Sequence, residues 1–109
     1  FIALGTDFPI ENISPIETFY AAVARKNKNG MPKNGFQIEN ALSRWETLKG
    51  MTIWAALSNF EEAEKGSLEV NKLADFIILD RNILTVPEDE ILKTQVKATY
   101  INGELVYKQ

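Results

Sequence analysis

The sequence predicts an α+β chain, with helices in its first half and strands in its second half. Apolar residues recur at helical spacing as far as residue 60, and capping signals precede several of these segments. After Gly66 the pattern changes to alternation and to short β-branched runs, the last two of which are separated by Asn-Gly. The pattern therefore divides the chain into residues 1–60 and residues 61–109.

The first predicted element is a short buried strand in the apolar run from Phe1 to Leu4, which ends at Gly5. A polar turn follows, so Asp7 is expected just beyond the carboxyl end of this strand. The chain starts inside an apolar run, with neither an initiator methionine nor a basic segment before it. We therefore expect it to be a piece of a longer protein.

The second predicted element is a helix from Ser14 to about Lys26. Ser14 is placed as its N-cap, Pro15 stands at the first helical position, and Glu17 would complete a capping box. Basic side chains at residues 25–28 follow, and they favour a charge cluster at the helix C-terminus over an anion site.

A surface loop and a short helix are expected next. Residues 27–35 combine glycine and proline with polar side chains, which is typical of a surface loop. Ser43 and Glu46 form a second capping box, and Gly50 is the expected C-terminal stop of a two-turn helix.

A third helix is predicted across residues 53–60, with Thr52 as its cap. Trp54 lies on its apolar face, and Trp45 belongs to the preceding helix. Two tryptophans could form a ligand platform, but large aromatic side chains on helix faces are more often core residues. The core interpretation is therefore favoured.

Four β segments are expected, at residues 66–70, 76–79, 96–101 and 104–108. The first alternates polar and apolar residues, as a half-buried strand does, whereas the second is continuously apolar and is typical of a strand covered on both faces. Pro87 opens at most one helical turn between the second and third. Asn102 and Gly103 predict a tight hairpin between the last two.

The composition excludes several classes of function. A net charge of −3 with interspersed signs argues against nucleic acid as a partner, and no apolar stretch is long enough to cross a membrane. Zero cysteines exclude disulfides and thiolate metal sites. Zero histidines remove the commonest metal ligand and general base, so any hydrolytic site formed by these residues alone would be incomplete.

Asp7 is the single candidate for catalysis and for metal binding. A carboxylate at the carboxyl end of a buried strand can bind a metal ion and accept a proton, although position alone favours a structural Asx-turn. The acidic side chains of Glu61, Glu62 and Glu64 are adjacent and diverge, which favours a solvated connector over a metal site. The glycine spacing supports no phosphate-binding loop.

Three stretches of the sequence carry a resemblance to a known family. Residues 5–11 (GTDFPIE), 66–80 (GSLEVNKLADFIILD) and 100–107 (YINGELVY) resemble, in this order, motifs of the amidohydrolase superfamily of metal-dependent hydrolases. The most similar branch contains the N-substituted formamide deformylases and the AepA-like proteins. Asn71 stands where that family commonly has glycine, and a left-handed turn tolerates either residue.

The resemblance implies a parent enzyme with an α/β TIM barrel, of which residues 1–60 would supply the last strand and the following helices. Residues 61–109 would supply C-terminal strands of a small composite β-sandwich. Asp7 would be the aspartate after the last barrel strand, which binds a divalent metal, in this family most often zinc, and shuttles a proton during hydrolysis of small amide-type substrates. The other ligands would lie upstream, so we expect no stoichiometric metal in this chain alone.

Two further interpretations remain open from the sequence. The chain could be a non-catalytic binding or interaction module, which the absence of histidine fits equally well. Strands that lack their sheet partners would also leave edges open, so a homodimer of the isolated chain through those edges is a third expectation.

Overall fold

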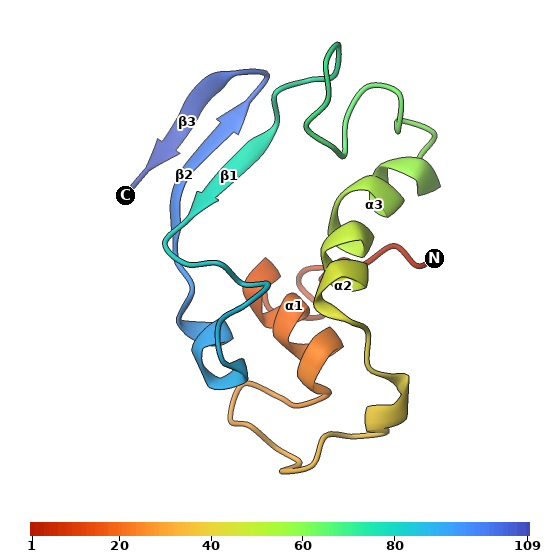
Figure 1. Cartoon of the computed structure of the whole chain (residues 1–109), viewed down its shortest axis with the longest axis vertical. Coiled ribbons are helices and arrows are strands. Elements are labelled where there is room, and N and C mark those ends of the chain that lie inside the picture. Colours follow the sequence, from red (N-terminus) through yellow and green to blue (C-terminus); the bar gives the residue numbers. More distant parts are fainter.

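The computed structural model describes all residues from 1 to 109 and confirms the α+β prediction (Figure 1). Helices come first and a three-stranded sheet comes last, and the chain reaches the sheet through a long irregular segment. No helix has the length and apolar character needed to cross a bilayer. The elements in chain order are α1 (Pro15–Ala24), the 3₁₀ helix η1 (Ile38–Asn40), α2 (Arg44–Met51), α3 (Ile53–Ser58), β1 (Phe76–Leu79), the 3₁₀ helix η2 (Glu88–Lys93), β2 (Val96–Ile101) and β3 (Glu104–Lys108).

Helix α1 begins after Ser14 as predicted, but the expected capping box does not form. Ser14 makes no side-chain cap hydrogen bond, and the Glu17 carboxylate, which would complete the box, accepts from another side chain. Asn12 Nδ2 donates to Glu17 Oε1 at 2.9 Å. The helix ends at Arg25, which takes a left-handed conformation with φ of 55°.

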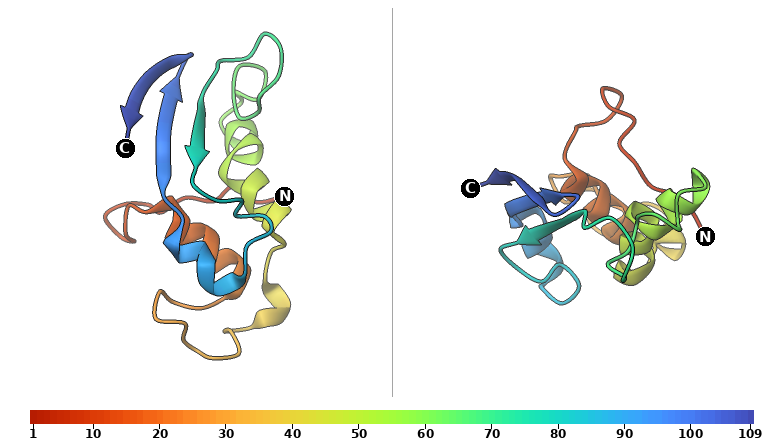
Figure 2. Two further views of the ribbon diagram at one scale, coloured as in Figure 1. Left: turned by 60° about the vertical axis from the view of Figure 1, so that its left-hand side comes forward. Right: turned by 90° about the horizontal axis from the view of Figure 1, so that it is seen from above.

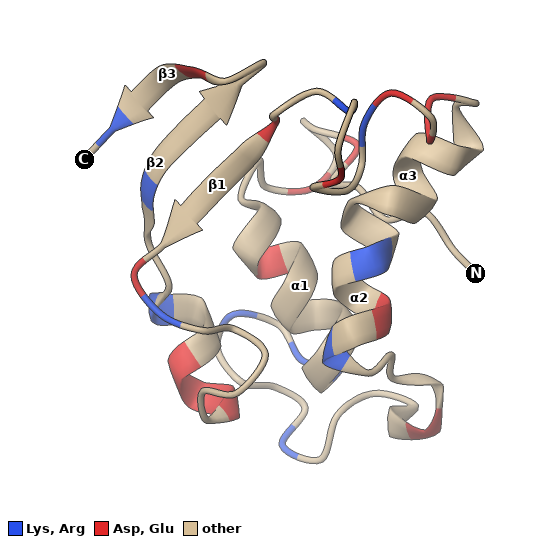
Figure 3. Cartoon of the chain, turned by 45° about the horizontal axis from the view of Figure 1, so that its top comes forward, with Lys and Arg blue, Asp and Glu red and all other residues tan.

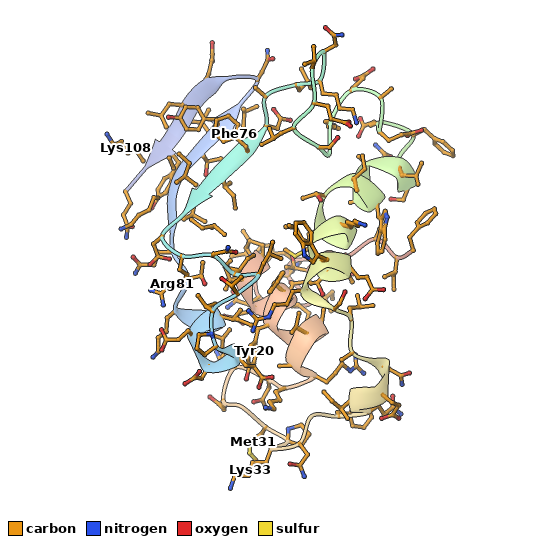
Figure 4. All side chains as sticks on the ribbon, in the orientation of Figure 1. Tyr20, Met31, Lys33, Phe76, Arg81 and Lys108 are labelled. Carbon is orange, nitrogen blue, oxygen red and sulfur yellow. The ribbon has the colours of Figure 1, made fainter.

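The segment between α1 and α2 is the predicted surface loop, followed by η1. Asn27 Oδ1 accepts from the backbone amides of Asn29 and Met31 at 2.9 and 3.2 Å, which shapes the turn after α1. Met31 and Lys33 lie at its outer tip, far from the sheet (Figure 4). The loop thus occupies the end of the molecule opposite the sheet.

Helix α2 confirms the second capping box and corrects the role of its glycine. Glu46 N donates to Ser43 Oγ at 3.2 Å and Ser43 N donates to Glu46 Oε2 at 2.9 Å. Gly50 was expected to stop the helix, yet it lies inside it, because α2 continues to Met51. Thr52 does not cap α3, since its Oγ1 donates back to Leu48 O at 2.7 Å.

The sheet is antiparallel with the order β1-β2-β3, and its hairpin is the one predicted (Figure 2). Asn102 and Gly103 have φ of 49° and 79°, the pair of positive values that a type I′ turn requires. Phe76 of β1 lies opposite Tyr100 of β2, and their rings stack with centroids 4.6 Å apart. The outer edges of β1 and β3 have no strand partner.

Two predicted strands are absent. Residues 1–4 and 66–70 form no strand, because neither segment lies beside another strand with which it could pair. Phe1 is 83% exposed and Val70 is 90% exposed, so the expected burial of these segments is also wrong. Strand geometry needs a neighbouring strand for its backbone hydrogen bonds, and these two segments have none in this chain.

The core lies between α1, η2 and the segment that follows β1. Its buried side chains are Phe19, Tyr20 and Ala24 of α1 together with Ile83 and Ile91. The left view of Figure 2 shows η2 against α1, which is where this cluster forms. Helix α1 therefore buries its apolar face against the element that joins β1 to β2.

The tryptophans are not core residues. Trp45 is 62% exposed, which contradicts the prediction that it packs inside. Trp54 is half-buried, and its ring centroid lies 5.9 Å from that of Phe1.

The chain exposes more surface than its mass requires. Its accessible surface is 7582 Å², whereas a compact protein of 12.3 kDa exposes roughly 6,100 Å². Ile77 and Ile78 point to opposite faces of the sheet and are 48% and 47% exposed, so neither face is fully covered. The excess, about 1,500 Å², is roughly twice the area of about 800 Å² that one partner buries in a standard protein–protein interface.

A charged network fixes the end of β1 against the start of β2. Arg81 binds the Asp80 carboxylate at 2.9 Å and Glu90 of η2 at 2.9 Å (Figure 4). The backbone amide of Gln95 donates to Asp80 Oδ1 at 2.9 Å. The Arg81 guanidinium and then the Gln95 amide lower the pKa of Asp80 to about 2, because both stabilise the charged carboxylate.

The core predicts a large loss of stability on substitution of Phe19, which is 1% exposed. Phe19→Ala should lower the free energy of unfolding by about 3–5 kcal/mol in urea denaturation, because the ring leaves a cavity. Phe60→Ala is the matched control, since Phe60 is 91% exposed, and it should change stability by less than about 0.5 kcal/mol. Equal losses in the two variants would show that the cluster is not the core.

The Asp80 network predicts a defined acid sensitivity. Because the folded pKa of Asp80 is lowered to about 2, its stabilisation is complete above the unfolded value near pH 4. It should be lost as the pH falls from about 4 to about 2. Urea midpoints of wild type and Asp80→Asn should differ at pH 5 and converge at pH 2. A difference that stays constant over this range would contradict the prediction.

Candidate active site

Asp7 lies in an exposed turn between the first residues and α1. The turn is closed by two backbone hydrogen bonds, from Ile10 N to Asp7 O at 2.9 Å and from Glu11 N to Thr6 O at 3.3 Å. Asp7 has φ of 47°, a left-handed conformation that aspartate tolerates better than most residues. The backbone therefore holds the turn and leaves the side chain exposed.

The carboxylate of Asp7 is not what closes this turn. An Asx-turn would require the amide of a residue one or two positions later to donate to the side chain, but the closing bonds run between backbone groups. A carboxylate free of protein donors keeps its oxygens available for a metal ion or a proton. Asp7 can therefore act as a metal ligand or as a proton acceptor.

Residues 1–4, which precede Asp7, rest on α2. Leu4 N donates to Gly50 O at 2.9 Å, and Gly50 is buried under this segment. The Asp7 turn is therefore attached to the helical part of the chain, although no sheet supports it.

The acidic connector does not form a second site. Glu61 pairs with Lys65 at 2.9 Å across one helical turn, and bonds from Asn59 and then Lys65 lower the pKa of Glu61. The structure contains no group of three His, Cys, Asp or Glu side chains arranged to hold a metal ion. Asp7 is therefore not part of a three-residue metal-binding group in this chain.

The basic run after α1 is used for structural contacts. Arg25 Nε donates to Phe36 O at 3.0 Å, and Lys26 pairs with Glu88 of η2. The bond to Glu88 raises the pKa of Lys26. Figure 3 shows acidic and basic residues interspersed along the chain.

The two hollows of the molecule do not surround Asp7. The larger, of about 1240 Å³, is an apolar groove between the sheet and the helices, with Ile77 and Leu79 on one side and Leu48 and Ala55 on the other. The smaller, of about 660 Å³, is lined mostly by polar residues and lies between α1 and the two ends of the Asp7 turn, Gly5 and Glu11. Asp7 itself lines neither hollow.

The donor set of this chain fits a metal ion as one ligand of several. Asp7 offers exposed carboxylate oxygens, which are suitable for zinc and for harder divalent ions. A catalytic zinc site needs about three protein ligands, so the remaining ones must come from other residues than these. Sequence reasoning identified Asp7 from its place after an apolar run, and the structure brings no further candidate to it.

Comparison with known proteins covers nearly the whole chain. The model of the amidohydrolase family matches residues 2–107. The chain is 32% identical over 108 residues to an N-substituted formamide deformylase of Arthrobacter pascens. The matched residues make up 99% of the chain and 19% of that protein. It is 27% identical over 105 residues to the putative amidohydrolase YtcJ of Bacillus subtilis, and these residues make up 96% of the chain and 20% of that protein.

A plant protein is similar to the same extent. The chain is 35% identical over 111 residues to the protein LONG AFTER FAR-RED 3 of Arabidopsis thaliana, which covers 97% of the chain and 18% of that protein. No solved structure matches. The chain thus spans about a fifth of the length of the curated relatives that it matches.

The donor set predicts weak zinc binding by the 109-residue chain. A single carboxylate with water as the other ligands holds zinc loosely, so the dialysed chain should retain far less than one equivalent by elemental analysis. Asp7→Asn should retain the same trace. Stoichiometric zinc that the substitution removes would show that the chain builds a complete site around Asp7.

Proposed function

The chain belongs to the amidohydrolase family, and from this membership we propose that it is the C-terminal part of a longer metal-dependent hydrolase. Two observations support this. The chain covers about a fifth of each relative, and the Asp7 carboxylate lies in an exposed turn without the other ligands of a hydrolytic site. The activity would belong to the longer protein, and this chain alone would have none.

The observation that carries the catalytic proposal is the exposed Asp7 carboxylate, held by backbone hydrogen bonds and free of protein donors. In the proposed site Asp7 provides one oxygen ligand to a divalent ion, with zinc as the first candidate. When bound, such an ion lowers the pKa of a coordinated water and polarises the substrate carbonyl. The other ligands would come from residues outside this chain.

Asp7 also has a proton to carry in this proposal. It accepts a proton from the hydrolytic water as the water oxygen forms its bond to the carbonyl carbon. It then gives that proton to the leaving nitrogen as the carbon–nitrogen bond breaks, so that an acid and an amine are released. The turn suits this task because its own hydrogen bonds leave both carboxylate oxygens free.

The proposed substrates are small amides, cleaved at a carbon–nitrogen bond that is not a peptide bond. The support comes from the family and from the name of the relative that is an N-substituted formamide deformylase. The pocket that would select among such amides is not formed by these residues, since neither hollow of the chain includes Asp7.

The exposed surfaces support a place for the chain in a larger architecture. We propose that residues 1–4 become the last strand of a (β/α)₈ barrel and that residues 61–109 join upstream strands in a composite β-domain. An apolar segment without a strand partner and a sheet that is half-exposed on both faces are what the removal of such neighbours would leave. The same neighbours would cover the excess accessible surface.

The proposal predicts that Asp7→Asn abolishes most of the activity of the full-length protein. The amide cannot accept the proton and is a poor metal ligand, so kcat for small N-substituted amides should fall by about 10²-fold or more. Asp89→Asn is the matched control, since Asp89 is exposed on η2, and its kcat should stay at the wild-type value.

Metal content separates the possible outcomes. A wild-type protein that holds a divalent ion and loses activity on chelation would support the metal-dependent mechanism. Full activity of Asp7→Asn would show that Asp7 is only a turn residue and would contradict the proposed site. The measurement is steady-state kinetics with elemental analysis of the same preparations.

A further inference from the structure

Gly50 makes the tightest contact between α2 and the first residues of the chain. A Cβ atom at this position would lie 2.9 Å from the backbone oxygen of Ile2 and 3.0 Å from Cγ and Cδ1 of Leu4. Both distances are shorter than ordinary contacts, and one of them is to backbone, which cannot move aside as a flexible side chain can. Only glycine therefore lets residues 1–4 approach the helix this closely.

The contact is also a point of attachment. The Leu4 amide donates to the Gly50 carbonyl at 2.9 Å, so the two backbones are joined at the position where they come closest. The Phe1 ring lies against Trp54 of α3, with centroids 5.9 Å apart. Residues 1–4 thus lie against α2 and α3. In the proposed barrel, neighbouring strands would bind their backbone groups, and the close packing on Gly50 would remain.

The position of Asp7 depends on how closely residues 1–4 pack against α2. Asp7 follows Leu4 by three residues, and the turn between them is closed internally by the bonds from Ile10 to Asp7 and from Glu11 to Thr6. A turn that is rigid within itself moves as a unit with the residues that carry it. A shift of Leu4 away from α2 would therefore be transmitted to the Asp7 carboxylate.

Gly50 is an unfavourable residue for the helix in which it lies. It sits within α2, where it has no positive φ and stops nothing. Glycine lowers helix propensity relative to alanine, so its presence at this buried position is explained by the close approach of residues 1–4. Gly50 therefore allows residues 1–4 to pack closely, and it lowers the stability of α2.

We propose that Gly50 is a positioning residue, which fixes the distance of Asp7 from the rest of the hydrolytic site by letting residues 1–4 lie directly on α2. The inference rests on the proposed function, because it gives Gly50 a role only if Asp7 has one. Gly50 does not touch the reacting atoms and acts through Asp7.

Gly66 provides a matched control for this proposal. A Cβ atom at Gly66 would lie 2.7 Å from Cβ of Ala56 and 3.0 Å from Cα of Ile53, and its φ of 90° disfavours other residues. Gly66→Ala should therefore destabilise the same helical unit. It should not displace Asp7, because the atoms it would strike belong to α3 and not to residues 1–7.

The experiment is a double-mutant cycle in the full-length protein, with kcat, KM and metal content measured for Gly50→Ala, Asp7→Asn and the double variant. Gly50→Ala should lower kcat by on the order of 10²-fold, since a displacement of about 1 Å has an effect of this size, and should leave KM nearly unchanged. In the Asp7→Asn background it should cause no further loss, because both substitutions remove the same contribution.

Leu4→Ala keeps the test possible if Gly50→Ala does not fold. It removes two of the three atoms that lie against Gly50 and adds no bulk, so the protein should fold with the Asp7 turn loosened. We expect a smaller loss of kcat, on the order of tenfold, which should again be absent in the Asp7→Asn background.

The outcomes are distinct. Additive losses of kcat in the cycle, or an equal loss of kcat in folded Gly66→Ala, would show that Gly50 acts only on stability and would overturn the proposal. Wild-type kcat in Gly50→Ala would overturn it as well. Wild-type activity of Asp7→Asn would overturn the proposed function itself, whatever Gly50→Ala does, so the two failures can be told apart.

Discussion

The arrangement of this chain depends on the close approach of backbone to the paired helices α2 and α3. Residues 1–4 lie on α2 where Gly50 has no side chain, and the chain that leads to the sheet lies on α3 where Gly66 has none. Both contacts would be blocked by a single carbon atom. The helix pair thus contacts both the segment that precedes Asp7 and the segment that leads to the sheet.

The buried interior is small compared with the surface that remains apolar. One cluster around Phe19 joins α1 to η2, while both faces of the sheet, the Trp45 side chain and the apolar groove between sheet and helices stay accessible. An independent domain of this length usually buries a larger share of its apolar surface. It is the distribution expected of a chain that forms part of a longer protein, as proposed above.

Two similar capping signals had different outcomes, and the difference shows how far local reasoning reaches. The box at Ser43 forms with both of its hydrogen bonds, from Glu46 N to Ser43 Oγ and from Ser43 N to Glu46 Oε2. The box at Ser14 does not form, and Glu17 Oε1 accepts instead from the side chain of Asn12, which lies outside the helix. The helix starts at the expected place in both cases, since proline and the apolar pattern suffice for α1. Start positions were therefore predictable, but bonding partners were not.

The sequence by itself determined the helices, the hairpin and the candidate carboxylate, because caps, apolar spacing, the Asn-Gly pair and the GTD motif act within a few residues. Tertiary structure decided what depends on distant neighbours. The apolar runs at residues 1–4 and 66–70 are not strands here, since a strand exists only beside another strand. The sequence alone predicts that Gly50 ends a helix. Only the packing of Ile2 and Leu4 against it shows that Gly50 is a point of close contact.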